Sequence, residues 1–190
     1  ASGMVTQGTG FYGLEKNMPV RDQIFLDPGF TRLDGMSGTD IYILGFDSDE
    51  DWVSQMVASV LDGFLYAVYS GRLIVRVEGI EISKDYLPKL MEQYKDKFED
   101  HADEYYQVLC ADEKTCPPYK MDVEGMGTAH LKLLIAPGLW HRVAIVRGTG
   151  MKIMNRGYIN NIIPFAGIMY IEGDALNTFL RSLENPQHTK

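Results

Sequence analysis

The sequence lacks the features that mark secreted and membrane-spanning proteins. Only two cysteines occur, Cys110 and Cys116, and a disulfide between them would close only a tiny loop. No apolar run approaches the roughly 20 residues needed to span a bilayer. The first residues have neither the charged nor the apolar stretch of a signal peptide. We therefore expect a cytoplasmic protein with no membrane partner.

The sequence also lacks the motifs that would complete a familiar active site. No Gly-x4-Gly-Lys-Ser/Thr segment is present, which excludes a P-loop kinase or ATPase, and no Gly-x-Ser-x-Gly elbow is present either. The four histidines share no ligand spacing, so we expect no metal site. Residues 8–13 match Gly-x-Gly-x-x-Gly, but no strand precedes them and no helix follows, so we interpret them as a flexible entry segment.

The chain has more acidic than basic residues. Its formal net charge is −8, and hydrophobic residues make up 45% of it, as in an ordinary globular protein. A chain of this charge repels phosphate backbones, so contact with a nucleic acid would need a local basic patch.

The first half of the chain contains the clearest predicted helix. Residues 1–38 show little periodicity, and we interpret them as an irregular extension that ends a missing upstream domain. The β-branched and aromatic run 39–46 predicts a strand. Ser48 and Asp51 resemble a capping box, and adjacent apolar pairs then recur every four positions from Trp52 to Val68. We expect a buried amphipathic helix that stops at Gly71.

The rest of the chain predicts a mixture of strands and helices. Strands are expected at 73–78, 119–124, 129–135, 142–147 and 165–172, with two helices after a Ser83 cap, a loop at 148–164 and a closing helix capped by Asp174. Sequential strands favour antiparallel pairing, while the early helix between two strands allows one crossover. We therefore predict an α+β domain over 39–190, with a mixed, largely antiparallel sheet and helices packed on one face.

The expected loop after the fourth of these strands is rich in cations. Arg147, Lys152 and Arg156 surround Gly148 and Gly150 in an otherwise acidic chain. Backbone amides near glycine together with Arg and Lys side chains can hold an anion such as a phosphate. The alternative is a solvated loop with ordinary surface cations.

The run Gly38-Thr39-Asp40-Ile41-Tyr42-Ile43-Leu44-Gly45-Phe46 is similar to a known motif, the Gly-Thr box. This box closes the nucleotide-binding domain of the GHKL ATPases, the superfamily of gyrase B subunits, heat-shock 90-type chaperones, MutL and MORC. The preceding Phe30-x-Arg32 and the closing run 183–188 resemble bacterial MutL and MORC relatives. The resemblance covers most of the chain from about Phe25 onward.

The resemblance implies that the chain is the end of an ATPase domain followed by a transducer domain of ribosomal-protein-like fold. Lys152, with Arg147 before it, would then be the catalytic cation that reaches the terminal phosphate of ATP, and Gly38 and Thr39 would border the nucleotide. The family's Asn-bearing helix, which holds magnesium, and its Asp-x-Gly-x-Gly segment, which reads adenine, do not occur here. ATP and magnesium would therefore be bound only together with an upstream ATPase domain.

The expected function is accordingly that of a transducer module, which couples ATP in a neighbouring domain to conformational change. The resemblance implies homodimerisation and action on DNA through the intact protein, in restriction or defence. The alternative is a non-enzymatic α+β interaction module that docks through the exposed part of the 52–68 helix or through the Tyr105-Tyr106 region.

Overall fold

The computed structural model describes residues 41, 43, 45, 46, 49–157 and 162–183. The chain divides into two compact units, Ala1–Phe46 and Asp47–Lys190, and every helix and strand of the described residues lies in the second. The boundary expected after residue 38 lies outside the described residues. The expected α+β class is confirmed: helices and strands are interspersed along the chain, and the main sheet is largely antiparallel.

The long helix α1, Trp52–Tyr69, forms where the four-residue apolar spacing predicts it. It kinks at Phe64, directly after Gly63. As predicted, Gly71 ends it: Gly71 has φ +74°, and the N–H of Arg72 donates a hydrogen bond to the carbonyl of Ala67. One side of the helix is buried, through Val57, Ala58, Leu61, Leu65, Ala67 and Val68.

The predicted capping box does not form at Asp51. Asp51 precedes the first helical residue but makes no side-chain cap hydrogen bond, and Ser48 lies outside the described residues. The carboxylate of Asp51 instead pairs with the ammonium of Lys97, 2.5 Å away. The carboxylate of Asp51 thus interacts with a lysine distant in sequence, whereas the local spacing had predicted an interaction within the start of the helix.

The expected strand at 73–78 is shorter and belongs to a hairpin. β1, Val75–Val77, pairs antiparallel with β2, Ile80–Ile82, which the sequence reasoning missed. Glu78 and Gly79 both have positive φ, as a two-residue hairpin turn requires.

The helices after this hairpin begin later than predicted. Ser83 does not cap a helix, because α2, Leu87–Gln93, starts after a turn, with proline in its first turn. A 3-10 turn, η3, Lys95–Lys97, leads to α3, Ala102–Cys110.

The main sheet has five strands in the order β3-β4-β7-β5-β6. The strands are β3 Tyr119–Val123, β4 Gly127–Ile135, β5 Arg142–Val146, β6 Lys152–Arg156 and β7 Phe165–Glu172. Only β5 and β7 pair in parallel, because the chain passes through β6 before it returns between β4 and β5. The sheet is therefore mixed and largely antiparallel, as predicted, but β6 occupies part of the segment expected to be a loop.

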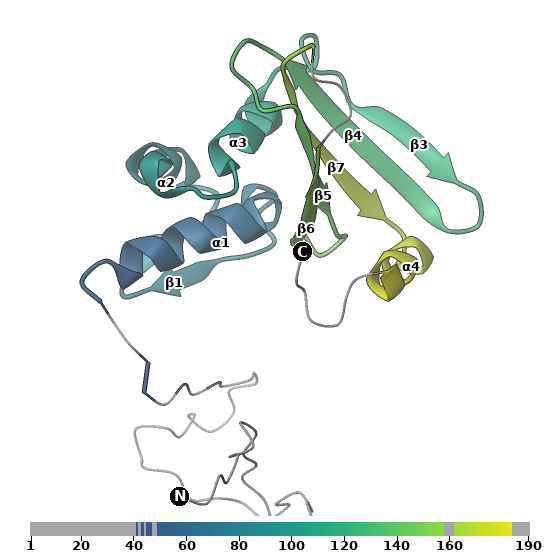
Figure 1. Cartoon of the computed structure of the whole chain (residues 1–190). Helices are drawn as coiled ribbons and strands as arrows, with labels where there is room; N and C mark the ends of the chain where they lie inside the picture. The colour runs from purple at the N-terminus through teal and green to yellow at the C-terminus, as the bar shows by residue number, and fades with distance from the viewer. Residues whose placement is uncertain (1–40, 42, 44, 47–48, 158–161, 184–190) are drawn as a thin grey trace, which may run out of the picture. The chain divides into compact units, whose positions relative to one another are not determined.

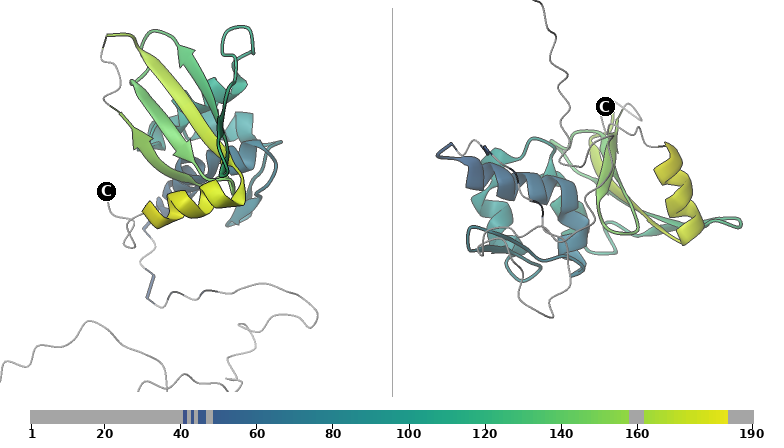
Figure 2. Two further views of the ribbon diagram at one scale, coloured as in Figure 1. Left: turned by 90° about the vertical axis from the view of Figure 1, so that its right-hand side faces the viewer. Right: turned by 90° about the horizontal axis from the view of Figure 1, so that it is seen from below.

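The two faces of this sheet are covered differently (Figures 1 and 2). α1 and α3 pack on one face, and α2 packs on α1 and α3. The last helix, α4, Asp174–Leu183, lies at one end of the opposite face, where Leu176 packs on Ala129 and Ile171. The expectation that helices pack on one face thus holds for α1–α3. Asp174 is the first residue of α4 rather than its cap.

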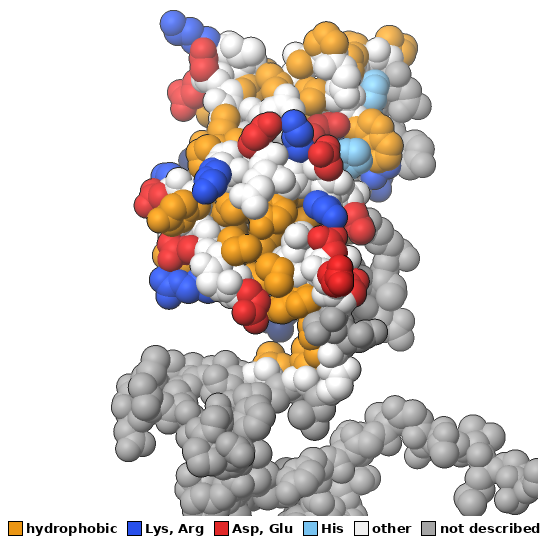
Figure 3. All heavy atoms as spheres, turned by 90° about the vertical axis from the view of Figure 1, so that its left-hand side faces the viewer, with side chains coloured by type: hydrophobic (Ala, Val, Ile, Leu, Met, Phe, Trp, Pro, Cys, Tyr) orange, Lys and Arg blue, Asp and Glu red, His pale blue; other side chains and the backbone are white. Residues whose placement is uncertain are grey.

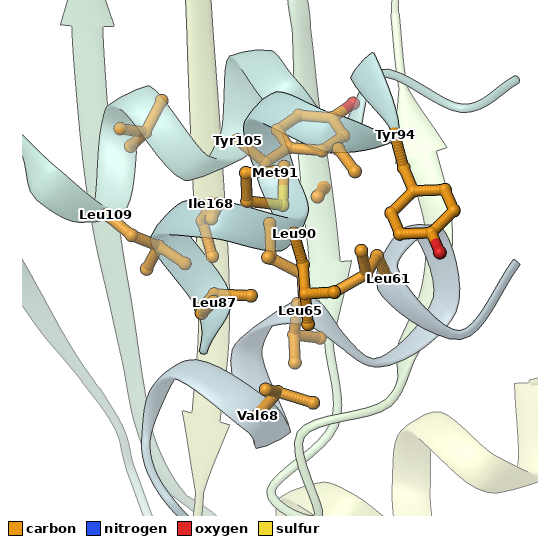
Figure 4. Packing of buried hydrophobic residues seen from close by; sticks show 14 of the residues in the cluster. Leu61, Leu65, Val68, Leu87, Leu90, Met91, Tyr94, Tyr105, Leu109 and Ile168 are labelled. Atoms are coloured by element: carbon orange, nitrogen blue, oxygen red, sulfur yellow. The ribbon is translucent and has the colours of Figure 1, made fainter. Parts of the chain in front are cut away.

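The larger core lies between the sheet and the layer formed by α1–α3 (Figure 4). Leu61 and Leu65 of α1 meet Leu87 and Leu90 of α2 there, with Ile168 on the sheet side. Burial of such side chains contributes about 1.5–3 kcal/mol each. This core fixes the position of every element that carries the candidate site.

The predicted strand at 39–46 is wrong for the residues that can be checked. Ile41, Ile43, Gly45 and Phe46 are not in a strand, and Ile41 and Ile43 are 83% and 71% exposed. A strand is stabilised by partner strands as well as by its own composition. Residues 39, 40, 42 and 44 lie outside the described residues.

Candidate functional site

The cationic turn between β5 and β6 is packed against two helices. The N–H of Arg147 donates to the carbonyl of Met151 at 2.9 Å, which closes the turn. Gly150 has φ +96°, and a Cβ built on it would lie 2.6 Å from the Cβ of Ala67 in α1. The turn is therefore packed against α1 through Gly150.

Two side chains hold Gly148 within this turn. The guanidinium of Arg72 donates to its carbonyl at 2.7 Å, and its own N–H donates to the side-chain oxygen of Asn177 in α4 at 2.8 Å. Any movement of the turn is therefore coupled to the end of α1 and to α4.

Lys152 is the first residue of β6 and points toward the helical layer. Its ammonium lies 2.9 Å from a carboxylate oxygen of Asp100 and 5.6 Å from the centre of the Tyr105 ring. The side chain is only 10% exposed. The charge of Lys152 is thus satisfied inside the protein, where low solvent access strengthens an ion pair.

Asp100 connects Lys152 to two further polar groups. Its second carboxylate oxygen accepts a hydrogen bond from the side-chain amide of Asn155 at 2.8 Å. The Asn155 oxygen accepts one from the Tyr105 hydroxyl at 2.9 Å. Burial and the nearby carboxylate of Asp100 raise the pKa of Tyr105, so this hydroxyl remains a donor at neutral pH.

Asp62 extends the network into α1. Its carboxylate accepts hydrogen bonds from the backbone N–H groups of Glu99, Asp100 and Ala102, at 3.0, 3.3 and 3.1 Å. These bonds satisfy the first N–H group of α3, which has no partner within the helix, and two amides of the turn before it. Burial raises the pKa of the Asp62 carboxyl, while these amides and the charge of Lys152 oppose that shift. We refer to Asp62, Asp100, Tyr105, Lys152 and Asn155 as the polar cluster.

Arg147 lies in a different place, beside α4. It borders a cavity of about 520 Å³, together with Arg181 and the acidic residues Glu172 and Asp174. Lys152 does not line this cavity. The structure thus separates the two predicted catalytic residues: Lys152 belongs to the polar cluster, and Arg147 faces a cavity with both signs of charge.

The two predicted nucleotide-binding residues, Gly38 and Thr39, lie outside the described residues, as does the glycine motif at 8–13. Among the described residues, no group of three or more His, Cys, Asp or Glu side chains is placed to hold a metal ion. Cys110 and Cys116 are both free thiols, in line with the short loop that a disulfide would have closed. In the part of the chain that the structure describes, no helix is both long and apolar enough to cross a membrane.

Two histidines of the sheet region pack against aromatic rings. His130 stacks on Tyr170 with ring centres 4.6 Å apart and lies 3.1 Å from the carboxylate of Glu172. His141 lies edge-on to Phe165 at a turn.

Sequence reasoning missed most of the polar cluster. One signal was present: Asp62 directly follows Leu61 in the apolar pattern of α1, where a carboxylate is expensive to bury without partners. No comparable signal marks Asp100 or Asn155, because each meets Lys152 only after the sheet and helices have assembled.

Comparisons with known proteins identify no relative. No protein-family model, curated protein sequence or solved structure matches this chain. The function of the chain must therefore be inferred from its own residues.

Proposed function

We propose that this chain is a transducer module of a GHKL-type ATP-dependent protein, which completes a neighbouring ATPase site and converts ATP binding into movement. The observation that carries the proposal is the position of Lys152. It is a lysine at the start of an edge strand, and its ion pair connects that strand to the turn before α3, which Asp62 ties to α1. A cation in this position can exchange its carboxylate partner for a phosphate, and this exchange can move the elements that the ion pair connects.

In this proposal the described residues would contribute only to the phosphate end of ATP. Lys152 and Arg147 are cations of the kind that hold phosphate oxygens. The described residues offer no cluster of acidic ligands for magnesium, so magnesium and adenine would be held by the upstream ATPase domain. ATP would supply the phosphoryl group, and Lys152 would stabilise negative charge that develops on it.

The coupling step is an exchange of partners by Lys152. In the described state its ammonium is paired with Asp100. When Lys152 turns to a phosphate, the carboxylate of Asp100 loses this ion pair but keeps its bond from Asn155. The turn before α3, which Asp62 ties to α1, is then held less tightly to β6 and can shift relative to it.

The test is Lys152→Met in the intact protein that includes the upstream domain. ATP turnover should fall by about two orders of magnitude or more, while ATP affinity changes little, because the interaction forms mainly in the transition state. Lys132→Met is the matched control: Lys132 is also a partly buried lysine of this sheet, and its ammonium donates to the carbonyls of Leu109 and Ala111. Unchanged turnover in Lys152→Met would remove Lys152 from the mechanism.

We further propose that the movement acts on DNA or on a protein partner in the cytoplasm of a bacterium, in restriction or defence. The support for this part is the resemblance alone. With a net charge of −8, the chain itself repels DNA on average, so contact with DNA would come from another part of the protein.

A second candidate, the non-enzymatic interaction module, is favoured by a separate observation. Of the surfaces suggested from sequence, Tyr105 is buried in the polar cluster, whereas Met56 on the exposed side of α1 is 40% exposed. The sheet also leaves part of one apolar face uncovered by α4. The two candidates separate in one assay: a pure interaction module would show no loss of ATP turnover in any Lys152 variant of the intact protein.

A further inference from the structure

The sheet face opposite α1 and α3 is almost entirely apolar. It is formed by every second residue of five strand segments, starting with the first residue of each segment. The segments are 119–123, 129–135, 143–145, 154–156 and 165–171. We call it the outer sheet face. Arg156 is its only charged member, and the remaining positions are hydrophobic residues or glycine.

One row of the outer sheet face crosses all five strands without a charged side chain. The pairing register aligns Tyr119, Leu131, Met169, Ile145 and Met154 side by side. Tyr119 and Met154, at the two edges, are exposed, and the three residues between them are half-buried. The row therefore offers a continuous apolar surface to its surroundings.

α4 covers only one end of this face. Leu176 packs on Ala129 and Ile171, near the start of β4 and the end of β7. At the opposite end, toward Ile135, no helix of the described residues lies over the sheet, as the left view of Figure 2 shows. Ile135 is 61% exposed there, whereas Val143 and Phe165 are buried. α4 therefore rises above one end of the outer sheet face and borders a part of the sheet that no described helix covers. We call this uncovered part the open ledge.

An open sheet face of a monomer normally carries polar residues toward water, in alternation with apolar residues toward the core. The outer sheet face does not, although the surface of the helical layer on the other side carries interspersed acidic and basic side chains (Figure 3). Contiguous exposed apolar surface of this kind marks an interaction site. The depletion of charge is typical of the core of a homodimer interface.

We propose that two copies of this chain pair through their outer sheet faces, related by a two-fold axis that runs across the strands. A face with a single charged residue is not repelled by an identical face, and two-fold pairing brings the same surface of both copies together. The proposal is independent of the ATPase proposal, because the pairing needs no nucleotide.

The shape of the face supports this symmetry. A helix is about 10 Å in diameter, and facing sheets pack about 10 Å apart, so α4 stands one layer above its sheet. An axis across the strands reverses their direction, and each α4 then lies beyond the open end of the partner's sheet. An axis along the strands would instead force the two copies of α4 against each other.

The available area is that of a modest dimer. The open ledge is five strands wide at Leu131, four at Leu133 and two at Ile135, a flat area on the order of 350 Å². Protruding side chains and the side of α4 add to this flat area. They bring the accessible area toward the roughly 600 Å² per partner at the lower end of specific interfaces. We therefore expect a dissociation constant in the micromolar range, about 1–50 µM.

The C-terminal residues do not offer an alternative cover for this face. Residues 184–190 contain no large apolar side chain. Residues 1–40 do contain several, and occupation of the face by that segment is one of the outcomes that the test separates.

The test is sedimentation equilibrium of the whole chain, wild type and Ile135→Glu, at about 5–200 µM without nucleotide. We expect a dimer for the wild type and an increase of about 100-fold or more in the dissociation constant for the variant. Ile135 is exposed, so the variant should fold, which circular dichroism checks. Ile74→Glu is the matched control, since Ile74 is 59% exposed and lies between α1 and β1, away from this face.

Three results would overturn the proposal. A monomeric wild type would do so. If the outer sheet face then binds a hydrophobic dye only after residues 1–46 are removed, that segment occupies the face in place of a second copy. A dimer that persists unchanged in Ile135→Glu would assign pairing to another surface. Equal weakening by Ile74→Glu and Ile135→Glu would show that the added charge acts through no defined interface.

Discussion

Gly150 allows the turn between β5 and β6 to lie directly on α1. Its φ of +96° is unfavourable for residues with a side chain, and a Cβ at this position would overlap the backbone and Cβ of Ala67. The turn also sets where β6 begins. The position of Lys152 inside the polar cluster therefore depends on the absence of a side chain two residues earlier.

We predict that Gly150→Ala destabilises the fold more than a change of backbone conformation alone explains. The positive φ costs about 1–2 kcal/mol, and the overlap with α1 should add about 1–3 kcal/mol. Gly138→Ala is the control, because Gly138 also has positive φ but has nothing within 4 Å of the added Cβ. Urea unfolding measures both, and equal losses in the two variants would refute the close approach.

At the scale of elements, the polar cluster joins three segments that are distant in sequence. Lys152 and Asn155 belong to β6, Asp100 lies in the turn before α3, and Asp62 lies in α1. Each polar group in the cluster has a partner, so the cluster avoids the penalty of an unsatisfied buried group. We expect the cluster to hold the edge strand to the helical layer.

This predicts a measurable coupling between Lys152 and Asp100. In a double-mutant cycle with Lys152→Met and Asp100→Asn, unfolding free energies should give a coupling of about 1–2 kcal/mol, because the ammonium is largely shielded from water. The exposed pair Arg76–Glu81 provides a comparison at the same N–O distance of 2.9 Å. If both pairs show equally weak coupling, the cluster does not hold β6.

At the scale of the molecule, both hydrophobic cores are built within the second unit of the chain. The larger lies between α1–α3 and the sheet, and the smaller lies under α4. All their described members fall in the unit Asp47–Lys190. The described core residues of the α+β domain thus all come from that unit.

We predict that residues 47–190 alone fold cooperatively. The far-UV circular dichroism per folded residue and the urea dependence of unfolding should match those of the α+β domain in the whole chain, because the same apolar area is buried. A broad, non-cooperative transition of the shortened chain would show that residues 1–46 complete one of the cores.

Sequence patterns predicted the elements whose apolar residues follow a regular spacing or form a continuous run along the chain. The four-residue spacing marked α1 together with its stop at Gly71, and β-branched runs marked β4, β5 and β7. The same reasoning missed β2 and β6. Both are short, and β6 places Asn155 and Arg156 at strand positions where composition favours a loop. Only pairing with β5 makes that segment a strand.

The sequence by itself determined the α+β class, the main helix and most of the strands, because periodicity of apolar residues depends on near neighbours. The tertiary structure alone decided that Lys152 pairs with Asp100 while Arg147 lies apart from it. It alone also decided that α4 leaves much of the outer sheet face open. These features depend on which distant strands and helices meet, and the free energy of those contacts is not encoded in any local pattern.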